Sequence, residues 1–165
     1  MSVRDPLHKI ISLDHLLKTV AQLKTEHKKV VTTNGCFDLL HWGHISYLWQ
    51  ARNLGDCLIV LVNTDESVRG LKGKLRPIQN QEARLMQLAG LESVDYVCLF
   101  SESTPEHVLS QIKPAVHTKG GDYDPDVLPE TAVVRKGGGR VQCLSLEPGF
   151  STTDLVNRIL QAEAN

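Results

Sequence analysis

A continuous apolar run, Cys57-Leu-Ile-Val-Leu-Val62, constrains the fold of this 165-residue chain more than any other feature. A strand with one face in water alternates polar and apolar residues, whereas a strand covered by helices on both faces is apolar throughout. The run is too short for a membrane helix, which needs about 18 apolar residues in succession. It therefore predicts a strand in the middle of a sheet that lies between two layers of helices.

Helical and strand-like segments alternate along the chain on either side of this run. Helices are predicted near residues 12–26, 45–54, 80–91, 104–113 and from 151 onward. Strands are predicted at residues 30–33, 57–62, 96–100, 115–118 and 141–146. This alternation is typical of parallel sheets with right-handed crossovers. We expect an α/β chain with a single Rossmann-like, doubly wound domain over residues 28–165, a mainly parallel sheet of about five strands, and an N-terminal helical segment, residues 1–27, packed on that domain.

Charge and cysteine content exclude several classes of protein. A formal net charge of -1 gives no electrostatic footprint for nucleic acid or an anionic membrane. The first ten residues, MSVRDPLHKI, are too polar for a signal peptide. The 4 cysteines are scattered and form no C-x-x-C pair, which favours a reducing compartment. We therefore expect a cytoplasmic protein that binds neither nucleic acid nor membrane.

The strongest candidate site is the turn after the first predicted strand, Asn34-Gly-Cys-Phe-Asp-Leu-Leu-His-Trp-Gly-His44. Ligands of doubly wound sheets bind at the carboxyl ends of the strands. Gly43 and His44 begin the next helix, whose N-terminus presents free N–H groups and a positive dipole end to phosphate. Gly43 allows close approach to the backbone, and His41 and His44 can both donate to one triphosphate. The turn therefore predicts a nucleotide-phosphate site.

Other interpretations of the same residues are less consistent with the sequence. A zinc site built from Cys36, His41 and His44 lacks a fourth ligand at ordinary spacing. No G-x-G-x-x-G follows the first predicted strand, and Gly70-Leu-Lys-Gly-Lys-Leu75 is not a Walker A loop. Dinucleotide oxidoreductases and P-loop kinases are therefore disfavoured. Histidines that only pack or lie at the surface are the structural alternative, and no direct metal ligand is assigned.

The segment Phe37-Asp38-x-x-His41-x-Gly43-His44 resembles the H-x-G-H signature of the cytidylyltransferase-like nucleotidyltransferase superfamily. From near Ile11 to the C-terminus, the chain is similar to the D-glycero-β-D-manno-heptose 1-phosphate adenylyltransferases. The segments that carry this similarity stand in family order: Thr33-Asn-Gly-Cys-Phe-Asp38, Gly55-Asp56-x-Leu-Ile-Val60, Asn63-x-Asp65, Leu71-Lys-Gly73, Arg76-Pro77, Val94-Asp-Tyr-Val97, Thr104-Pro105, Lys119-Gly-Gly-Asp-Tyr123 and Ser151-Thr-Thr153. Residues 124–139 fit the family pattern poorly, and His117 and Thr118 stand where apolar residues are expected.

The resemblance implies roles for individual residues. His41, His44 and Lys72 would be catalytic, with Lys72 in a mobile basic loop at residues 69–79. The residues that would bind the nucleotide are Thr33, Asn34, Gly35, Cys36, Phe37, Gly43, Lys119, Gly120, Asp122, Ser151, Thr152 and Thr153. Those that would bind the acceptor are Asp38, Asn63, Asp65, Arg76 and Arg84. The structural alternatives are turns, helix caps, solvated lysines and a surface salt bridge at Arg84.

By the same resemblance, the substrates are ATP, with Mg²⁺ as its cofactor, and a sugar 1-phosphate. The implied reaction is ADP-heptose synthesis, which supplies a precursor of lipopolysaccharide or surface glycan, and the implied assembly is a homodimer. A cytidylyltransferase acting on glycerol 3-phosphate and an FMN adenylyltransferase are the alternatives within enzymes. A non-catalytic nucleotide-binding module is the alternative of another class, and the presence of both histidines and Lys72 disfavours it.

Overall fold

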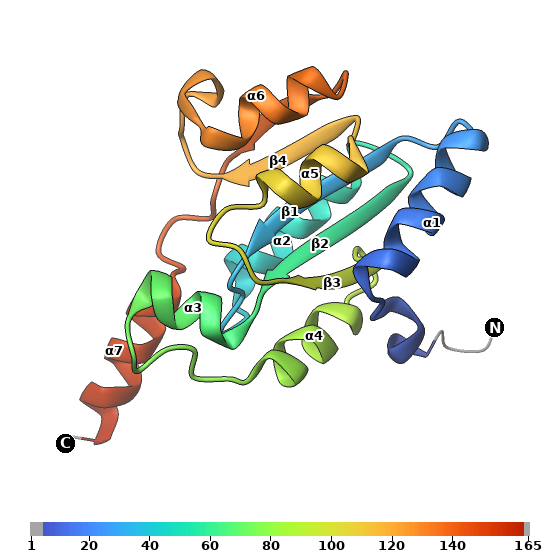
Figure 1. Ribbon diagram of the computed structural model, residues 1–165. Coiled ribbons are helices and arrows are strands. Elements are labelled where there is room, and N and C mark those ends of the chain that lie inside the picture. The colour runs from blue at the N-terminus through green and yellow to red at the C-terminus, as the bar shows by residue number, and fades with distance from the viewer. Residues whose placement is uncertain (1–4, 164–165) are drawn as a thin grey trace.

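A computed structural model describes residues 5–163 of the chain. Five strands form a single parallel sheet in the order β3-β2-β1-β4-β5 (Figure 1). The strands are β1 (Val30–Gly35), β2 (Cys57–Asn63), β3 (Tyr96–Phe100), β4 (Val116–Gly120) and β5 (Arg140–Leu144). All 7 residues of β2 are buried. The predicted fold class and the predicted sheet of about five strands are confirmed.

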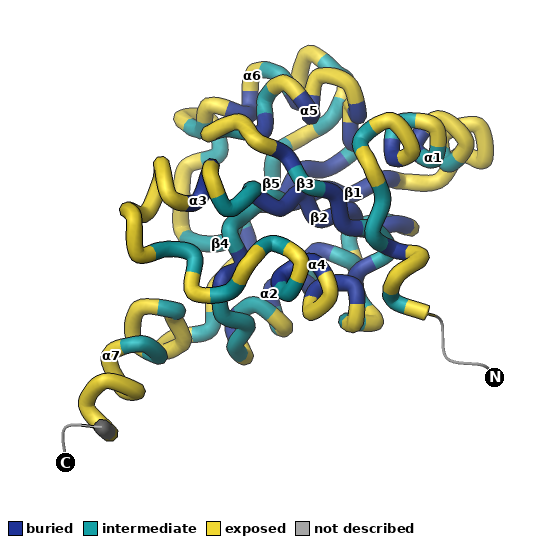
Figure 2. The backbone as a smooth tube through the Cα atoms, turned by 60° about the horizontal axis from the view of Figure 1, so that its bottom comes forward, coloured by how far each residue is buried: buried dark blue, intermediate teal, exposed yellow. Residues whose placement is uncertain are grey.

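Helices cover both faces of this sheet, and the buried strands run between them (Figures 1 and 2). The helices are η1 (Pro6–Lys9), α1 (Leu13–Thr25), α2 (Trp42–Arg52), α3 (Asp65–Lys72), α4 (Gln81–Ala89), α5 (Glu106–Ile112), η2 (Pro125–Val127), α6 (Pro129–Lys136) and α7 (Thr152–Glu163). Among the described residues, no helix is both long enough and apolar enough to span a bilayer.

The apolar core is divided by the sheet into two layers. Leu58 and Val60 of β2 pack with α2 and α4, whereas Ile59 and Leu61 pack with α1, α5 and α6. Because successive side chains of a strand point to opposite faces, both sets must be apolar when helices cover both faces. This division accounts for the uninterrupted apolar run from which the fold was predicted.

Two helices, α3 and α6, lie where the sequence pattern predicts none. The hydroxyl of Thr64 caps α3 by accepting from the backbone N–H of Ser67, and the helix continues through Gly70 to Lys72. The expectation of a loop over residues 69–79 is therefore wrong for its first part, since Lys72 is the last residue of a helix. Helix α6 begins with Pro129 at its first position and buries Glu130.

The strand order reverses beside β1, because β2 and β3 continue on one side of it and β4 and β5 on the other. In open α/β sheets, such a reversal creates a crevice at the carboxyl ends of the strands. The turn from β1 to α2, the end of β2 and the end of β4 all reach this edge. Helix α7 begins at the same edge and projects away from the rest of the chain (Figures 1 and 2).

Candidate active site

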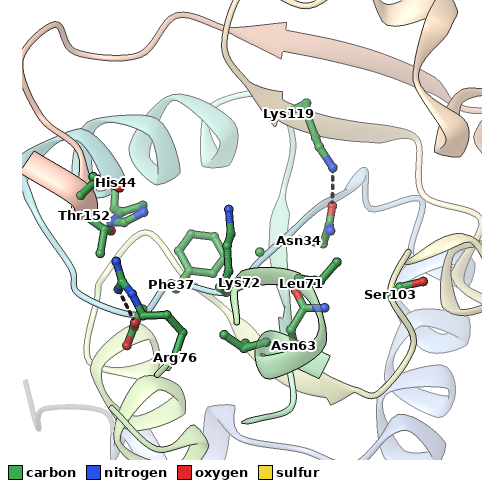
Figure 3. A pocket seen from close by; sticks show the side chains of 15 residues that line it. Asn34, Phe37, His44, Asn63, Leu71, Lys72, Arg76, Ser103, Lys119 and Thr152 are labelled. Carbon is green, nitrogen blue, oxygen red and sulfur yellow. Dashed lines mark hydrogen bonds and ion pairs between the residues drawn. The ribbon is translucent and has the colours of Figure 1, made fainter. Parts of the chain in front are cut away.

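A cavity of about 440 Å³ lies at the carboxyl edge of the sheet (Figure 3). Its walls come from the β1–α2 turn, the end of β2, helix α3, the loop that follows α3, the end of β4 and the first turn of α7. The sequence-predicted residues that line it are Asn34, Gly35, Cys36, Phe37, Asp38, His44, Asn63, Lys72, Arg76, Lys119, Thr152 and Thr153. Segments far apart in the sequence thus contribute to one site.

The two histidines of the turn lie at the start of α2. His41 is the N-cap of this helix and His44 lies in its first turn. Their rings stack, with centroids 3.9 Å apart and planes inclined by 26°. His41 lines a second cavity of about 220 Å³, together with Gly43 and Ser151, and His44 and Thr152 line both cavities. The α2 and α7 helix starts therefore lie side by side at the site.

Both imidazoles are held in their neutral forms. Burial, and after it the charge of His41, lowers the pKa of His44 to about 4, although the Leu39 backbone acts in the opposite direction. Burial also lowers the pKa of His41. No side chain caps the N-terminus of α2. A Cβ at Gly43 would lie 3.1 Å from the His41 ring, so glycine leaves room for that ring. An anion here would meet backbone N–H groups and neutral imidazoles.

Asp38 connects the β1–α2 turn to the loop that follows α3. Its carboxylate accepts from Arg76 Nη1 at 2.7 Å (Figure 3). It also accepts from the backbone N–H groups of Ile78 and Gln79 at 2.8 and 2.9 Å. Burial by itself would raise the pKa of this carboxyl, but the backbone N–H groups and Arg76 together hold it below its ordinary value. Asp38 is therefore ionised and keeps the guanidinium of Arg76 at the cavity wall.

Arg84 and Asp65, which the sequence predicts to bind the acceptor, do not line the cavity. The Arg84 side chain has no exposed surface, and its Nη2 donates at 2.8 Å both to the Asn63 carbonyl and to Asp65 Oδ1. The same guanidinium also donates to the carbonyls of Cys36 and Gln79. The expected contact of Arg84 with an acceptor phosphate is therefore wrong. Arg84 pairs with Asp65 and links the ends of β1 and β2 through hydrogen bonds to carbonyls at those ends.

Other predicted nucleotide-binding residues lie outside the main cavity. Thr33 is buried, and its hydroxyl lies 2.7 Å from the Tyr47 hydroxyl, because strand alternation turns it toward α2. Gly120 has Leu146 where its own side chain would stand, with 2.7 Å between a built Cβ and Leu146 Cδ2. Asp122 is exposed and is not among the residues that line the cavity. Ser151 caps α7 by accepting from the Asp154 N–H at 3.0 Å, as its position in the sequence predicts.

Several residues of the site were not predicted from the sequence. Val68, Leu71 and Ser103 line the main cavity, and the first two lie one helical turn apart on α3, the helix that the sequence pattern did not predict. Glu130 of α6 is buried next to Lys119. Within residues 5–163, no group of three or more His, Cys, Asp or Glu side chains is arranged to hold a metal ion.

The chain is similar in sequence to a known protein family and to individual proteins. Residues 32–157 match the cytidylyltransferase-like family. The bifunctional protein HldE of Actinobacillus pleuropneumoniae is 50% identical over 150 residues, and HldE of Haemophilus influenzae (strain PittGG) is 51% identical over 150 residues. Both alignments cover 91% of this chain and 32% of the relative, so the chain spans about a third of the length of these curated relatives.

Solved structures of other proteins are also similar to this chain. A lipopolysaccharide core biosynthesis protein from Thermoplasma volcanium GSS1 is 31% identical with a TM-score of 0.60, covering 73% of this chain and 97% of that one. A pantoate-beta-alanine ligase from Francisella tularensis has a TM-score of 0.60 at 16% identity, covering 94% of this chain and 79% of that one, and is similar in fold alone. Every segment that lines the main cavity falls inside the matched residues 32–157. The chain therefore belongs to the cytidylyltransferase-like family.

Proposed function

We propose that this chain is an adenylyltransferase that joins the AMP moiety of ATP to D-glycero-β-D-manno-heptose 1-phosphate, forming ADP-heptose and pyrophosphate. The observation that carries the proposal is the set of groups around one cavity: His44 at an uncapped helix start, with Lys72, Arg76 and Lys119 on the other walls (Figure 3). Such a set suits a polyanion. The choice of sugar is supported by the family-ordered segments and by the similarity to a lipopolysaccharide core biosynthesis protein.

In this proposal, an oxygen of the acceptor phosphate attacks the α-phosphorus of ATP in line. The bond from the α-phosphorus to the bridging oxygen breaks, and its electron pair leaves with pyrophosphate, so no covalent enzyme intermediate is needed. The enzyme acts by positioning and by stabilising charge. His41 and His44 donate hydrogen bonds to phosphate oxygens from the start of α2. Lys72 adds positive charge, and Arg76, held by Asp38, receives the acceptor phosphate.

In the proposed reaction, Mg²⁺ binds together with ATP as its chelate. The one carboxylate that lines the cavity, among the residues that the structure describes, is Asp38, and Arg76 and two backbone N–H groups already surround it. The lining therefore suits a chelate whose ligands are phosphate oxygens and water, the arrangement that Mg²⁺ commonly adopts with nucleotides. The cation lowers the charge of the triphosphate, while the residues of this chain orient it.

The resemblance also supports proposals about assembly and organisation. We propose a cytoplasmic homodimer, which sedimentation equilibrium of the purified chain would distinguish from a monomer. Leu16 and Val20 of α1 are buried in the apolar layer that α1 forms with α5, α6 and one face of the sheet. This packing supports treating residues 5–27 as a helical segment that packs on a nucleotidyltransferase domain of residues 28–163, and residues 1–4 and 164–165 of the two predicted ranges lie outside the described residues.

The proposal is tested by measuring pyrophosphate release with ATP or CTP, each combined with heptose 1-phosphate, glycerol 3-phosphate or FMN. Release with ATP and heptose 1-phosphate, accompanied by ADP-heptose, is the expected result. Release only with CTP and glycerol 3-phosphate, or only with ATP and FMN, would assign the chain to one of the alternative reactions. ATP binding that survives His44→Ala, without turnover of any pair by the parent protein, would indicate a nucleotide-binding module.

A further inference from the structure

A carboxylate that the mechanism above does not use lies behind the cavity. Glu130, at the start of α6, is only 2% exposed, and its Oε1 lies 2.7 Å from Lys119 Nζ and 3.8 Å from His117 Nε2. The His117 ring is fully buried, and its Nδ1 lies 2.8 Å from the Thr32 hydroxyl. A buried carboxylate needs a partner of opposite charge. Lys119, which lines the cavity, is that partner.

The contacts of Lys119 determine where its ammonium group points. An ammonium group has three N–H bonds. Lys119 Nζ donates one of them to Asn34 Oδ1 at 3.2 Å (Figure 3). The same nitrogen forms an ion pair with Glu130 Oε1 at 2.7 Å. The Lys119 side chain is 28% exposed and lines the main cavity. The ammonium group therefore keeps N–H donors for a ligand, while the ion pair with Glu130 and the hydrogen bond to Asn34 hold its nitrogen at the cavity wall.

The same contacts remove most of the net charge that Lys119 would bring to the cavity. Burial alone would raise the pKa of Glu130, but the hydrogen bond and charge of Lys119, together with smaller contributions, hold it below its ordinary value. Burial lowers the pKa of His117 despite the neighbouring carboxylate of Glu130. At neutral pH, Glu130 is therefore negative and His117 neutral. The Lys119–Glu130 pair has no net charge.

We propose that Glu130 is a positioning residue, which acts through Lys119 to present one directed N–H to the nucleotide as a hydrogen-bond donor. Lys119 then differs in kind from Lys72, which is exposed at the end of α3. This inference rests on the proposed function, because it takes ATP as the ligand of the cavity. It concerns binding of the nucleotide and is independent of the acceptor.

Glu130→Gln separates this role from two simpler ones, because the change removes the charge and keeps the size. If Lys119 acts as a free counter-ion, removing a negative charge beside a polyphosphate makes ATP bind more tightly. If Glu130 only stabilises the fold, the melting temperature falls and ATP affinity stays the same. If Glu130 positions Lys119, ATP affinity falls. The sign of the change in affinity therefore distinguishes these roles.

The experiment is calorimetric binding of α,β-methylene-ATP with Mg²⁺ to the parent chain, Glu130→Gln, Lys119→Met and the double variant. We expect Lys119→Met to raise Kd about tenfold, equivalent to about 1.4 kcal/mol, and Glu130→Gln to raise it by about half an order of magnitude or more. The double variant should bind no more weakly than Lys119→Met, because both changes remove the same contact. Asp126→Asn, which breaks the exposed Asp126–Arg135 ion pair beside α6, is the matched control and should bind like the parent.

Parental or tighter binding by Glu130→Gln overturns the inference. It is also overturned if the loss of affinity in the double variant equals the sum of the losses in the two single variants. If Glu130→Gln does not fold, Glu130→Asp replaces it in the cycle, because it keeps the charge and withdraws it by one methylene group. Loss of affinity in Glu130→Asp supports positioning, and parental affinity overturns it. A parent chain that binds the analogue but makes no ADP-heptose overturns the proposed function and leaves this inference standing. A parent chain that does not bind the analogue overturns both.

Discussion

The imidazole rings of His41 and His44 lie in contact at the start of α2, with their centroids 3.9 Å apart. Two stacked imidazoles cannot both be protonated without placing like charges together, and burial already disfavours the charged form of each. Each ring therefore meets a ligand as a neutral group that can donate one hydrogen bond. An arriving polyphosphate would supply the negative charge that makes protonation favourable.

Replacing His44 should slow the chemical step with little effect on folding. Removing one preorganised donor to developing charge typically costs 10²–10³ in kcat, and we expect a loss of about that size for His44→Ala. The control is His107→Ala, since His107 is exposed on α5 and, among the contacts described, its imidazole ring is bonded only to Gln111. Steady-state kinetics with both substrates saturating would check this prediction. A loss of less than about threefold would remove His44 from the mechanism.

Stability should decrease as the pH falls toward the folded-state pKa of His44. That pKa is lowered from 6.5 to about 4, so below pH 6.5 the unfolded chain binds a proton that the folded chain excludes. The contribution of neutral His44 is complete above pH 6.5 and is lost progressively between pH 6.5 and 4. Urea unfolding of the parent and His44→Gln across this range measures it. The variant should show a shallower decline, and equal slopes would show that His44 titrates normally in the folded chain.

Lys72 and Lys74 should differ in their effect on turnover although they are two residues apart. Lys72 ends α3 and lines the cavity, whereas Lys74 is exposed in the following loop and is not part of the lining. We expect Lys72→Ala to lower kcat by about 10²-fold, because a cation near the developing charge is lost. Lys74→Ala should stay within about twofold of the parent in the same assay. Similar losses in both would indicate a general electrostatic effect of the loop.

Arg84 should be among the residues most important for stability. Arg84→Met leaves the carbonyls of Cys36 and Asn63 and the carboxylate of Asp65 without their donor. Removing one partner of a buried ion pair typically costs about 3–5 kcal/mol, and we expect a loss near the lower figure because Asp65 is partly exposed. Arg135→Met, which breaks an exposed ion pair, should cost less than about 1 kcal/mol. Denaturant unfolding compares the two variants, and equal losses would contradict the role given to Arg84.

Apolar pattern and capping residues were sufficient to predict the sheet and several helices. Ser12 and Asn80 stand at the starts of two predicted helices and accept hydrogen bonds from the backbone N–H groups of His15 and Ala83, as capping residues do. Helix α3 was not predicted because it is short, contains Gly70 and has only two large apolar residues, and α6 was not predicted because it is short and begins with a proline. Where the apolar face is narrow, tertiary packing decides the helix.

The arrangement of charges inside the site was less predictable than its location. A turn after β1 with paired histidines identifies the cavity, because strand ends in a parallel sheet meet at one edge. Arg84 and Glu130 are charged residues on helices, and such residues usually lie in water. Their burial depends on partners far away in sequence, such as the Asn63 carbonyl and Lys119. The spacing of residue types along the sequence does not predict those partners.

Labelled ATP distinguishes transfer of its α-phosphorus, which nucleotidyl transfer requires, from transfer of its γ-phosphorus. The chain would be incubated with Mg²⁺ and heptose 1-phosphate, in parallel with ATP labelled at the α- or the γ-phosphorus, and the products separated. We predict that the α-label appears in ADP-heptose and the γ-label in pyrophosphate, and that His44→Ala slows both by the same factor. Transfer of the γ-label to the sugar, or both labels remaining in ATP, would contradict nucleotidyl transfer by this site.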